Sequence, residues 1–437
     1  MEHLFELLRS AQKVAEQAEV FLVSSRGTPV HFEANKLKQI QTKENARVAL
    51  RIFREGRVGF ATANDIADVD TLLAMAVETS QFGSTANFKF PSLQNYPQVN
   101  VFDPGVEDVG VEKMIELGEE LIAKVREHAP NILCDVEVTK GTGLVHLINS
   151  QGGEASYDKS FLGLGLEGVL IEGTDMLFVG DSESSCRLVS GVDGLADRVI
   201  KQLEWAREKA TVLTKGLPVI FTPRGVASAL LSPIALAFSG KTVLEGASAL
   251  KDRLGEQVFD KRLALWDDAT IAYGIGSCPC DDEGMPSQRL PLITDGVVSN
   301  FLYDLETAAL AGTRSTGSGR RMGGLPRPSI SSLIMGKGDV SFDSMVGDVK
   351  EGLIVEQLIG AEQGNLLAGD FSGNVLLGYK VEGGEIAGRV KDVMISGNVY
   401  GVLAELVAIG DEARWVGGIL QAPPLYCPRI SVASKGS

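Results

Sequence analysis

The chain contains very little histidine. Only four of its 437 residues are histidine, at positions 3, 31, 128 and 146, and none follows residue 146. A Ser/His/Asp hydrolase needs a histidine beside its serine, and a zinc peptidase needs two histidines about one helical turn apart with a glutamate between them. Neither pattern occurs, and the G-x-S-x-G turn of a serine hydrolase is absent as well. This inventory gives the chain alone no recognisable catalytic machinery.

Long apolar runs and surplus positive charge are also missing. The most apolar stretch, Leu217–Ser239, is interrupted by Arg224 and three prolines, so it is too broken to span a bilayer. The N-terminal residues mix charges into their apolar positions and do not match a signal peptide. The net charge of −16 leaves no basic stripe that would neutralise phosphates. We expect neither a membrane nor a nucleic acid as a partner.

Cysteine is scarce and does not form a disulfide framework. The five cysteines are an odd number without regular spacing, which suits a reducing cytoplasm. Cys278-Pro-Cys280 could begin a metal or redox site, but no histidine follows to complete one, and Cys427 is the only further cysteine in that half. Buried structural thiols are the favoured interpretation. We expect no metal or cofactor in this chain and a cytoplasmic location.

Aromatic residues make up only 6% of the chain, whereas glycine is abundant, with 50 residues. This composition predicts many short strands joined by tight turns. Apolar periodicity predicts helices over residues 4–18, 64–78, 110–128 and 194–210, and a short polar hinge follows at Thr211–Gly216. We therefore predict an α+β protein of two domains. Residues 1–212 form an N-terminal domain of antiparallel strands with packed helices. Residues 213–437 form a mostly antiparallel β domain, either barrel-like or of two packed sheets.

Individual elements can be placed within these domains. Asn64-Asp65 is a candidate cap for the second helix, and Ser232-Pro233 matches an N-cap followed by a proline at the first helical position, with helix to about Phe238. Glu382–Glu385 is typical of a hairpin turn. Strands are expected at residues 20–24, 30–40, 46–53, 58–63, 133–138, 144–149, 161–171, 177–180, 270–275, 292–297, 353–358, 374–381 and 393–395.

Two phosphate-binding patterns are assigned to chance. The glycines of Gly163–Gly168 match G-x-G-x-x-G, but a strand-like run follows where a helix is needed to hold a pyrophosphate. Gly240-Lys241-Thr242 resembles the end of a P-loop, but Ala235 stands where that motif requires glycine. Neither pattern predicts a nucleotide.

The most unusual stretch runs from Cys278 to Pro326. It combines an acidic turn, a probable hairpin and a loop rich in glycine and arginine, and such loops are often functional. The acidic residues could hold a hard cation, although their spacing matches no known loop, or could act as the acids of an unrelated hydrolase. Arg320-Arg321 could clamp a carboxylate or a partner's acidic surface. The competing interpretation is a solvated loop held by its own ion pairs.

The same stretch carries a resemblance. Its motifs D-D-E-G-x-P (281–286), L-I-x-D-G-V (292–297) and S-T-G-S-G-R-R (315–321) resemble the TldD/PmbA family. Residues Val48–Ile66 and Glu351–Val399 extend this resemblance over essentially the whole chain. It implies a cytoplasmic peptidase made of two related subunits. The TldD type carries zinc on an H-E-x-x-x-H helix, and the TldE or PmbA type lacks this motif and completes a closed chamber around the substrate.

The resemblance also implies which type this chain is. Aligned on Leu230-Leu231, the zinc motif falls on residues 232–237, where Ser232 and Ala237 replace the histidines and Pro233 replaces the glutamate. The chain is therefore similar to a PmbA-type subunit without zinc or catalysis of its own, and a TldD-like partner would supply the metal. Its β edges would hold an extended peptide. A homodimeric, non-catalytic peptide-binding or regulatory protein is the alternative. The candidate peptide or partner contacts are Asp281, Asp282, Glu283, Gly284, Thr316, Gly317, Arg320 and Arg321.

Overall fold

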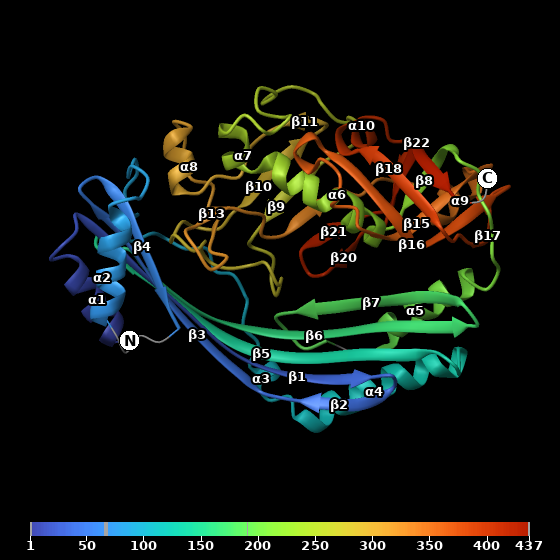
Figure 1. Cartoon of the computed structure of the whole chain (residues 1–437), viewed down its shortest axis with the longest axis horizontal. Helices are drawn as coiled ribbons and strands as arrows, with labels where there is room; N and C mark the ends of the chain where they lie inside the picture. Colours follow the sequence, from blue (N-terminus) through green and yellow to red (C-terminus); the bar gives the residue numbers. More distant parts are fainter. Residues whose placement is uncertain (1, 65–68, 190, 436–437) are drawn as a thin grey trace.

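A long curved β-sheet lies beneath a second, more globular β assembly (Figure 1). The computed structural model describes residues 2–64, 69–189 and 191–435. The sheet has the order β4-β3-β1-β5-β6-β7, with β2 paired to β1, and every pairing in it is antiparallel. Its strands are β1 (Gln17–Glu33), β2 (Lys36–Ile40), β3 (Lys43–Arg54), β4 (Arg57–Ala63), β5 (Leu133–Asn149), β6 (Glu154–Glu172) and β7 (Asp175–Ser185).

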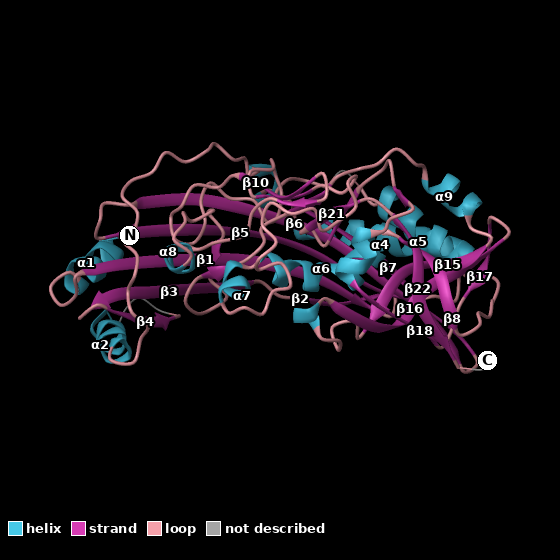
Figure 2. Ribbon diagram, turned by 90° about the horizontal axis from the view of Figure 1, so that it is seen from above, coloured by secondary structure: helices cyan, strands magenta, loops and turns pink. Residues whose placement is uncertain are grey.

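Helices cover one face of this sheet at its two ends. Val20 of β1 packs in one cluster with α1 (Glu2–Ala11) and α2 (Val69–Ser80). Val30 and Phe32 pack in another cluster with α4 (Val111–His128) and α5 (Asp193–Trp205). Figure 2 shows these helix pairs at opposite ends of the long strands. Because successive side chains of a strand alternate between faces, His31 points to the opposite face, toward the rest of the molecule.

The C-terminal half contains a closed β-barrel. Its sheet has the order β15-β8-β22-β18-β16-β17, and the additional pairing of β15 with β16 closes the ring, with β19 (Ala408–Ile409) paired to β22. Only β8 and β15 are parallel within it. The strands are β8 (Lys215–Phe221), β15 (Glu351–Ile359), β16 (Asp370–Glu382), β17 (Glu385–Arg389), β18 (Val393–Asn398) and β22 (Leu425–Ser434).

A second, open sheet lies beside the barrel, with α6 (Pro223–Phe238) between them. Leu230 and Ile234 of α6 share one hydrophobic cluster with Val355 of the barrel and Leu420 of the open sheet. The open sheet has the order β11-β10-β9-β14-β21-β20. It consists of β9 (Leu265–Asp268), β10 (Arg289–Thr294), β11 (Val297–Val298), β14 (Leu333–Met335), β20 (Arg414–Val416) and β21 (Leu420–Ala422). The smaller elements are α3 (Pro104–Glu107), α7 (Gly240–Leu244), α8 (Leu305–Leu310), α9 (Phe342–Asp348), α10 (Val399–Ala404), η1 (Leu366–Ala368), β12 (Gly319–Arg320) and β13 (Arg327–Pro328).

This architecture confirms the α+β prediction. The hairpin at Glu382–Glu385 is also confirmed, and its Gly383 and Gly384 have φ of 62° and 85°, a region that glycine adopts without strain. The division into residues 1–212 and 213–437 stays a prediction. One hydrophobic cluster runs across it and joins Leu121 of α4 to Tyr379 of β16. Among the described residues, no helix combines the length and the apolar character needed to cross a membrane.

Two strand predictions in the first sheet were too short. β1 and β5 each run unbroken for 17 residues, where two separate strands were expected. Polar residues and glycines interrupt the apolar pattern there, yet the ladder continues, with Ser25 opposite Gly143 and Gly27 opposite Gly141. The single strand expected at residues 30–40 was wrong, because a turn at Ala34-Asn35 divides it between the end of β1 and β2. Two helices were predicted too long, because the first ends at Ala11 and the fourth at Trp205. Of the candidate cap Asn64-Asp65, Asp65 lies outside the described residues.

The prediction for α6 was wrong at its start. The helix begins at Pro223, and the Thr222 hydroxyl caps it by accepting a hydrogen bond from the Gly225 N–H at 3.2 Å. Ser232 and Pro233 therefore lie inside the helix, where Pro233 removes one backbone hydrogen bond. The strand expected at residues 270–275 was also wrong. That segment is a series of turns in which Tyr273 has φ of 60°.

Candidate functional site

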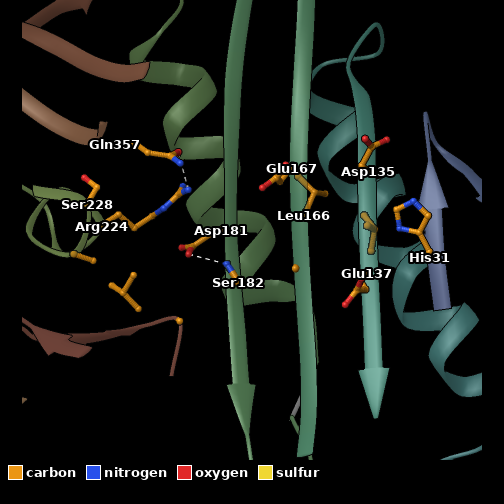
Figure 3. A pocket seen from close by; sticks show the side chains of 15 residues that line it. His31, Asp135, Glu137, Leu166, Glu167, Asp181, Ser182, Arg224, Ser228 and Gln357 are labelled. Atoms are coloured by element: carbon orange, nitrogen blue, oxygen red, sulfur yellow. Dashed lines mark hydrogen bonds between the residues drawn. The ribbon is translucent and has the colours of Figure 1, made fainter. Parts of the chain in front are cut away.

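A cleft of about 650 Å³ separates the first sheet from the C-terminal half. Strands β1, β5, β6 and β7 form one wall, and the start of α6, β15 and the turn after β20 form the other. Figure 3 shows the side chains that line it. Both β7 and β20 end their sheets, so the cleft lies between two edge strands. Free strand edges are where an extended chain can add by backbone pairing.

The sheet wall carries three exposed carboxylates. Asp135 lies directly opposite Glu167 on the neighbouring strand, and Glu137 lies opposite His31. Asp135 Oδ1 accepts from the Ala34 N–H at 2.8 Å, and Glu137 Oε1 accepts from the Thr139 hydroxyl at 2.8 Å. Within the described chain, none of the three carboxylates forms an ion pair. This wall is therefore negatively charged, and like charges directly opposite one another repel.

The opposing wall is cationic. Arg224, on the first turn of α6, donates from Nη1 to the Gly180 carbonyl and from Nη2 to Gln357 Oε1 at 2.9 Å. Both acceptors are uncharged, so these bonds fix the guanidinium without neutralising it. One turn further along α6, the Ser228 hydroxyl accepts from the Leu358 N–H at 3.2 Å. These bonds hold the start of α6 against β7 and β15.

A buried ion network fixes the base of the cleft. Asp181 of β7 accepts from Arg198 Nε at 2.6 Å and from Arg414 Nη1 at 2.5 Å. Burial by itself would raise the pKa of Asp181, but the charges of Arg414, Arg198 and Arg224 outweigh burial and lower the pKa. The carboxylate therefore stays ionised and ties α5 and β20 to the edge of the first sheet.

Helix α6 does not offer a zinc site. The Ser232 hydroxyl donates to Glu362 Oε1 at 2.6 Å, and the side chains of Pro233 and Ala237 are buried. A hydroxyl, a proline ring and a methyl group are not the imidazole, thiolate or carboxylate ligands that zinc takes, and none is a general base. Within the part of the chain that the structure describes, no group of three or more His, Cys, Asp or Glu residues is arranged to hold a metal ion.

The Cys278–Pro326 segment is fastened to the first sheet through buried charges. Glu283 Oε1 accepts from Arg51 Nη1 at 2.7 Å, and its Oε2 accepts from the Leu305 N–H at 2.7 Å. Arg51 also donates to Glu19 at 3.1 Å, and Glu19 contacts Arg321. Burial by itself would lower the pKa of Arg51, but Glu19 and Glu283 outweigh it and raise the pKa.

The protonation of Glu283 follows from its partners. Burial raises the pKa of this carboxyl and Arg51 opposes the rise. Each of its oxygens accepts a short hydrogen bond from a group that can only donate, so a proton on Glu283 would have no acceptor. We therefore assign the pair with Arg51 as ionised.

The other candidate residues of the segment also bond mainly to the chain itself. Asp281 is buried and accepts backbone N–H groups of Glu283, Met285 and Gly319 at 2.8–3.0 Å. Burial raises its pKa to about 6. Asp282 Oδ2 accepts from the Arg321 N–H at 2.7 Å, and Gly284 is buried with its carbonyl accepting from Tyr96.

The arginine loop is held in the same way. Arg320 donates to Cys278 Sγ at 3.0 Å and to Ser331 Oγ at 2.7 Å. The Thr316 hydroxyl accepts from the Tyr303 N–H at 2.8 Å, and Gly317 packs against Pro286 with φ of 72°. The segment has its own ion pairs but is not a solvated loop, and Met322, with 91% of its surface exposed, is its outward point.

The sequence analysis proposed none of the charged residues that line the cleft as a functional residue. Asp135 and Glu137 alternate with buried apolar residues in one strand, a pattern that marks one exposed face. Arg224 directly follows the Thr222-Pro223 cap, so a correct helix start would have placed it on the first turn. Glu19 and Arg51 stand among apolar residues, which is the available signal for buried charges.

Comparisons with known proteins agree with this architecture. The chain is 24% identical over 448 residues to the metalloprotease PmbA of Escherichia coli O157:H7, covering 98% of this chain and 94% of the relative. It is 27% identical over 237 residues to a metalloprotease TldD homolog of Haemophilus influenzae, covering 52% of this chain and 49% of the relative. The crystal structure of TldE from Thermococcus kodakarensis matches with a TM-score of 0.89 at 22% identity, covering 99% of this chain and 100% of that chain.

Family models match along most of the chain. The PmbA/TldA metallopeptidase domain 1 matches residues 18–80, the central domain matches residues 104–207, and the C-terminal domain matches residues 214–434. Together these segments contain both walls of the cleft and the fastened segment at residues 278–326. The chain therefore belongs to the TldD/PmbA family.

Proposed function

We propose that this protein is the non-metal subunit of a TldD/TldE-type cytoplasmic metalloprotease. A zinc-bearing TldD-like partner supplies the metal and the general base, and this chain completes the chamber that holds the peptide. What supports the proposal is the content of α6, where the resemblance to the TldD type puts the zinc motif on Ser232, Pro233 and Ala237. None of them can bind zinc or accept the proton of an attacking water.

The cleft supports a role in peptide binding. Its volume of about 650 Å³ falls within the range of roughly 300–1,000 Å³ that is usual for small-ligand pockets. Its position between the edge strands β7 and β20 suits an extended chain. At Gly180, however, both backbone groups of β7 are already bonded, to Gln202 and Arg224. In this proposal β20, whose last residue Val416 lies in the cleft wall, is the edge that takes the peptide, although the Val416 carbonyl itself accepts from the Ile419 N–H.

In this proposal the segment at residues 278–326 contacts the TldD-like partner. Its eight candidate residues, named above, act as the internal frame, and exposed Met322 faces outward. The buried pair of Arg51 and Glu283 keeps this frame in one position relative to the sheet. All five cysteines are buried and unpaired, which supports a reducing, cytoplasmic location.

The test is reconstitution. This chain and a TldD-like protein with an intact H-E-x-x-x-H motif are purified separately and together, and bound zinc and cleavage of an unstructured peptide are measured. We expect zinc only in the partner and efficient cleavage only in the mixture. A partner variant with both motif histidines replaced by alanine is the control and should abolish cleavage by the mixture.

Stoichiometric zinc and full activity in this chain alone would contradict the proposal. A stable homodimer that ignores the partner would favour a non-catalytic peptide-binding or regulatory protein.

A further inference from the structure

The two walls of the cleft differ in charge in a way that the fold itself does not require. Glu167 and Asp135 face each other on adjacent strands, and no cation of the described chain pairs with either. Across the cleft, Arg224 bonds only to uncharged oxygens. Figure 3 shows Arg224 and Gln357 toward one end of the pocket and Asp135 and Glu137 toward the other.

Several other buried or half-buried arginines of the molecule are paired with carboxylates. Arg51, Arg198 and Arg414 each contact carboxylates within 3.4 Å. Arg224 differs from these three arginines because its hydrogen bonds go to uncharged oxygens. They position the guanidinium at the cleft, where its charge also acts on Asp181. The carboxylates opposite are likewise left to solvent or to a ligand. A polarised pocket of this kind complements a ligand with separated charges of both signs.

We propose that the cleft binds a short peptide in one direction, with its free α-amino group at the carboxylates of Asp135, Glu137 and Glu167 and its α-carboxylate toward Arg224. The inference rests on the proposed function and adds the substrate class, which is short peptides with free termini. An ammonium group can share three donors among the carboxylates. The planar guanidinium of Arg224 is suited to a carboxylate. The edge of β20, on the same wall as Arg224, would hold the peptide backbone.

A metal cation is the competing ligand for the acidic wall. The wall has no buried, preformed ligand set, and two of its carboxylates already accept hydrogen bonds from Ala34 and Thr139. A cation alone would bind only the acidic wall and would make no contact with Arg224. The peptide satisfies both walls at once.

The experiment compares four forms of one tetrapeptide of uncharged residues. The peptide is used free, N-acetylated, C-amidated, or blocked at both ends, and binding to the full chain and to its complex with a TldD-like partner is measured by calorimetry. Each block should weaken binding by about 2- to 5-fold, as expected for a partly exposed charge pair. In Glu167→Gln, acetylation of the peptide should no longer weaken binding, whereas amidation should still do so. In Arg224→Gln, amidation should no longer weaken binding, whereas acetylation should still do so.

Matched controls separate local from general effects. Glu172→Gln, on the opposite face of the same strand, and Arg429→Gln, at an exposed position of β22, should change neither effect. Equal binding of all four forms would overturn the inference while leaving peptide binding in place. Failure of every form to bind would instead count against the proposed function. Calcium ions that bind alone with micromolar affinity, and do so less tightly in Glu167→Gln, would overturn the inference in favour of a cation site.

Discussion

Arg51 and Glu283 are 232 positions apart in sequence, yet Nη1 and Oε1 lie 2.7 Å apart with both side chains buried. Arg51 belongs to β3 of the first sheet, and Glu283 to the segment that carries the family's most specific motifs. The guanidinium also lies over the rings of Phe88 and Phe90, with Cζ 5.2 and 4.9 Å from their centroids. This pair therefore connects the two halves of the molecule in an apolar surrounding, where an unpaired charge is costly.

Replacing Arg51 should destabilise the protein strongly. Arg51→Met leaves Glu19 and Glu283 buried with Arg321 as their remaining cation, and loss of one partner from a buried pair costs about 3–5 kcal/mol. Urea unfolding followed by circular dichroism measures the change. Arg54→Met, three positions along the same strand and partly exposed, should lie within about 0.5 kcal/mol of the parent. If Arg51→Met lowered the free energy of unfolding by only the small amount expected for Arg54→Met, the pair of Arg51 and Glu283 would not hold the two halves together.

Elements of this fold can be predicted from the sequence when the interactions that define them lie within a few positions along the chain. Local signals sufficed for the hairpin at Glu382–Glu385 and for α4, because turn residues and apolar spacing act within a few positions. The start of α6 was misplaced because two proline-containing caps, Thr222-Pro223 and Ser232-Pro233, offer the same local signal. Both prolines are buried, and the caps differ in what their hydroxyls contact: Thr222 accepts from the Gly225 N–H, whereas Ser232 bonds to Glu362 of a distant segment.

The site required information that a single sequence does not contain. Asp135 and Glu167 face each other only because of the register between β5 and β6, and a shift of one residue would place them on opposite faces. The contact between Arg51 and Glu283 likewise depends on the packing of the two halves. The family motifs marked Asp281–Gly284 and Arg320-Arg321 as special, but their burial and internal bonding follow from the tertiary structure.

Acid should destabilise the protein through His146. This side chain is fully buried on β5, and neither of its ring nitrogens has a hydrogen-bond partner in the described chain. Burial lowers its pKa below the usual 6.5, and the carboxylate of Glu154, 3.6 Å away, opposes the shift only in part. Just below pH 6.5 the unfolded state therefore binds more protons than the native state, so stability rises with pH up to about 6.5 and falls as acid is added.

Urea midpoints at pH 7.5 and pH 5.5 test this expectation. His146→Leu replaces the imidazole with an apolar side chain of similar size near Phe5, and it should flatten the pH dependence of stability. An equally steep loss of stability in His146→Leu would assign the acid sensitivity to other groups.

The close approach of α6 to β15 should make Gly225 intolerant of a side chain. A Cβ at this position would lie 2.1 Å from the Val355 carbonyl oxygen, which belongs to the barrel backbone and cannot rotate away. Gly225→Ala should therefore destabilise the protein by about 1–3 kcal/mol, as overpacking usually does. Because Arg224 is the adjacent residue, the same shift of α6 should weaken peptide binding in the cleft.

The matched variant is Gly347→Ala in α9, where a Cβ would meet no atom within 4 Å. Alanine is the better helix former, so this change should be neutral or stabilising by up to about 1 kcal/mol. Thermal unfolding of both variants gives the comparison, and peptide affinity gives the second readout. If Gly225→Ala unfolds at the parent's temperature and binds peptide equally well, the start of α6 is free to move away from β15. The cationic wall would then not be held in a fixed position by the barrel.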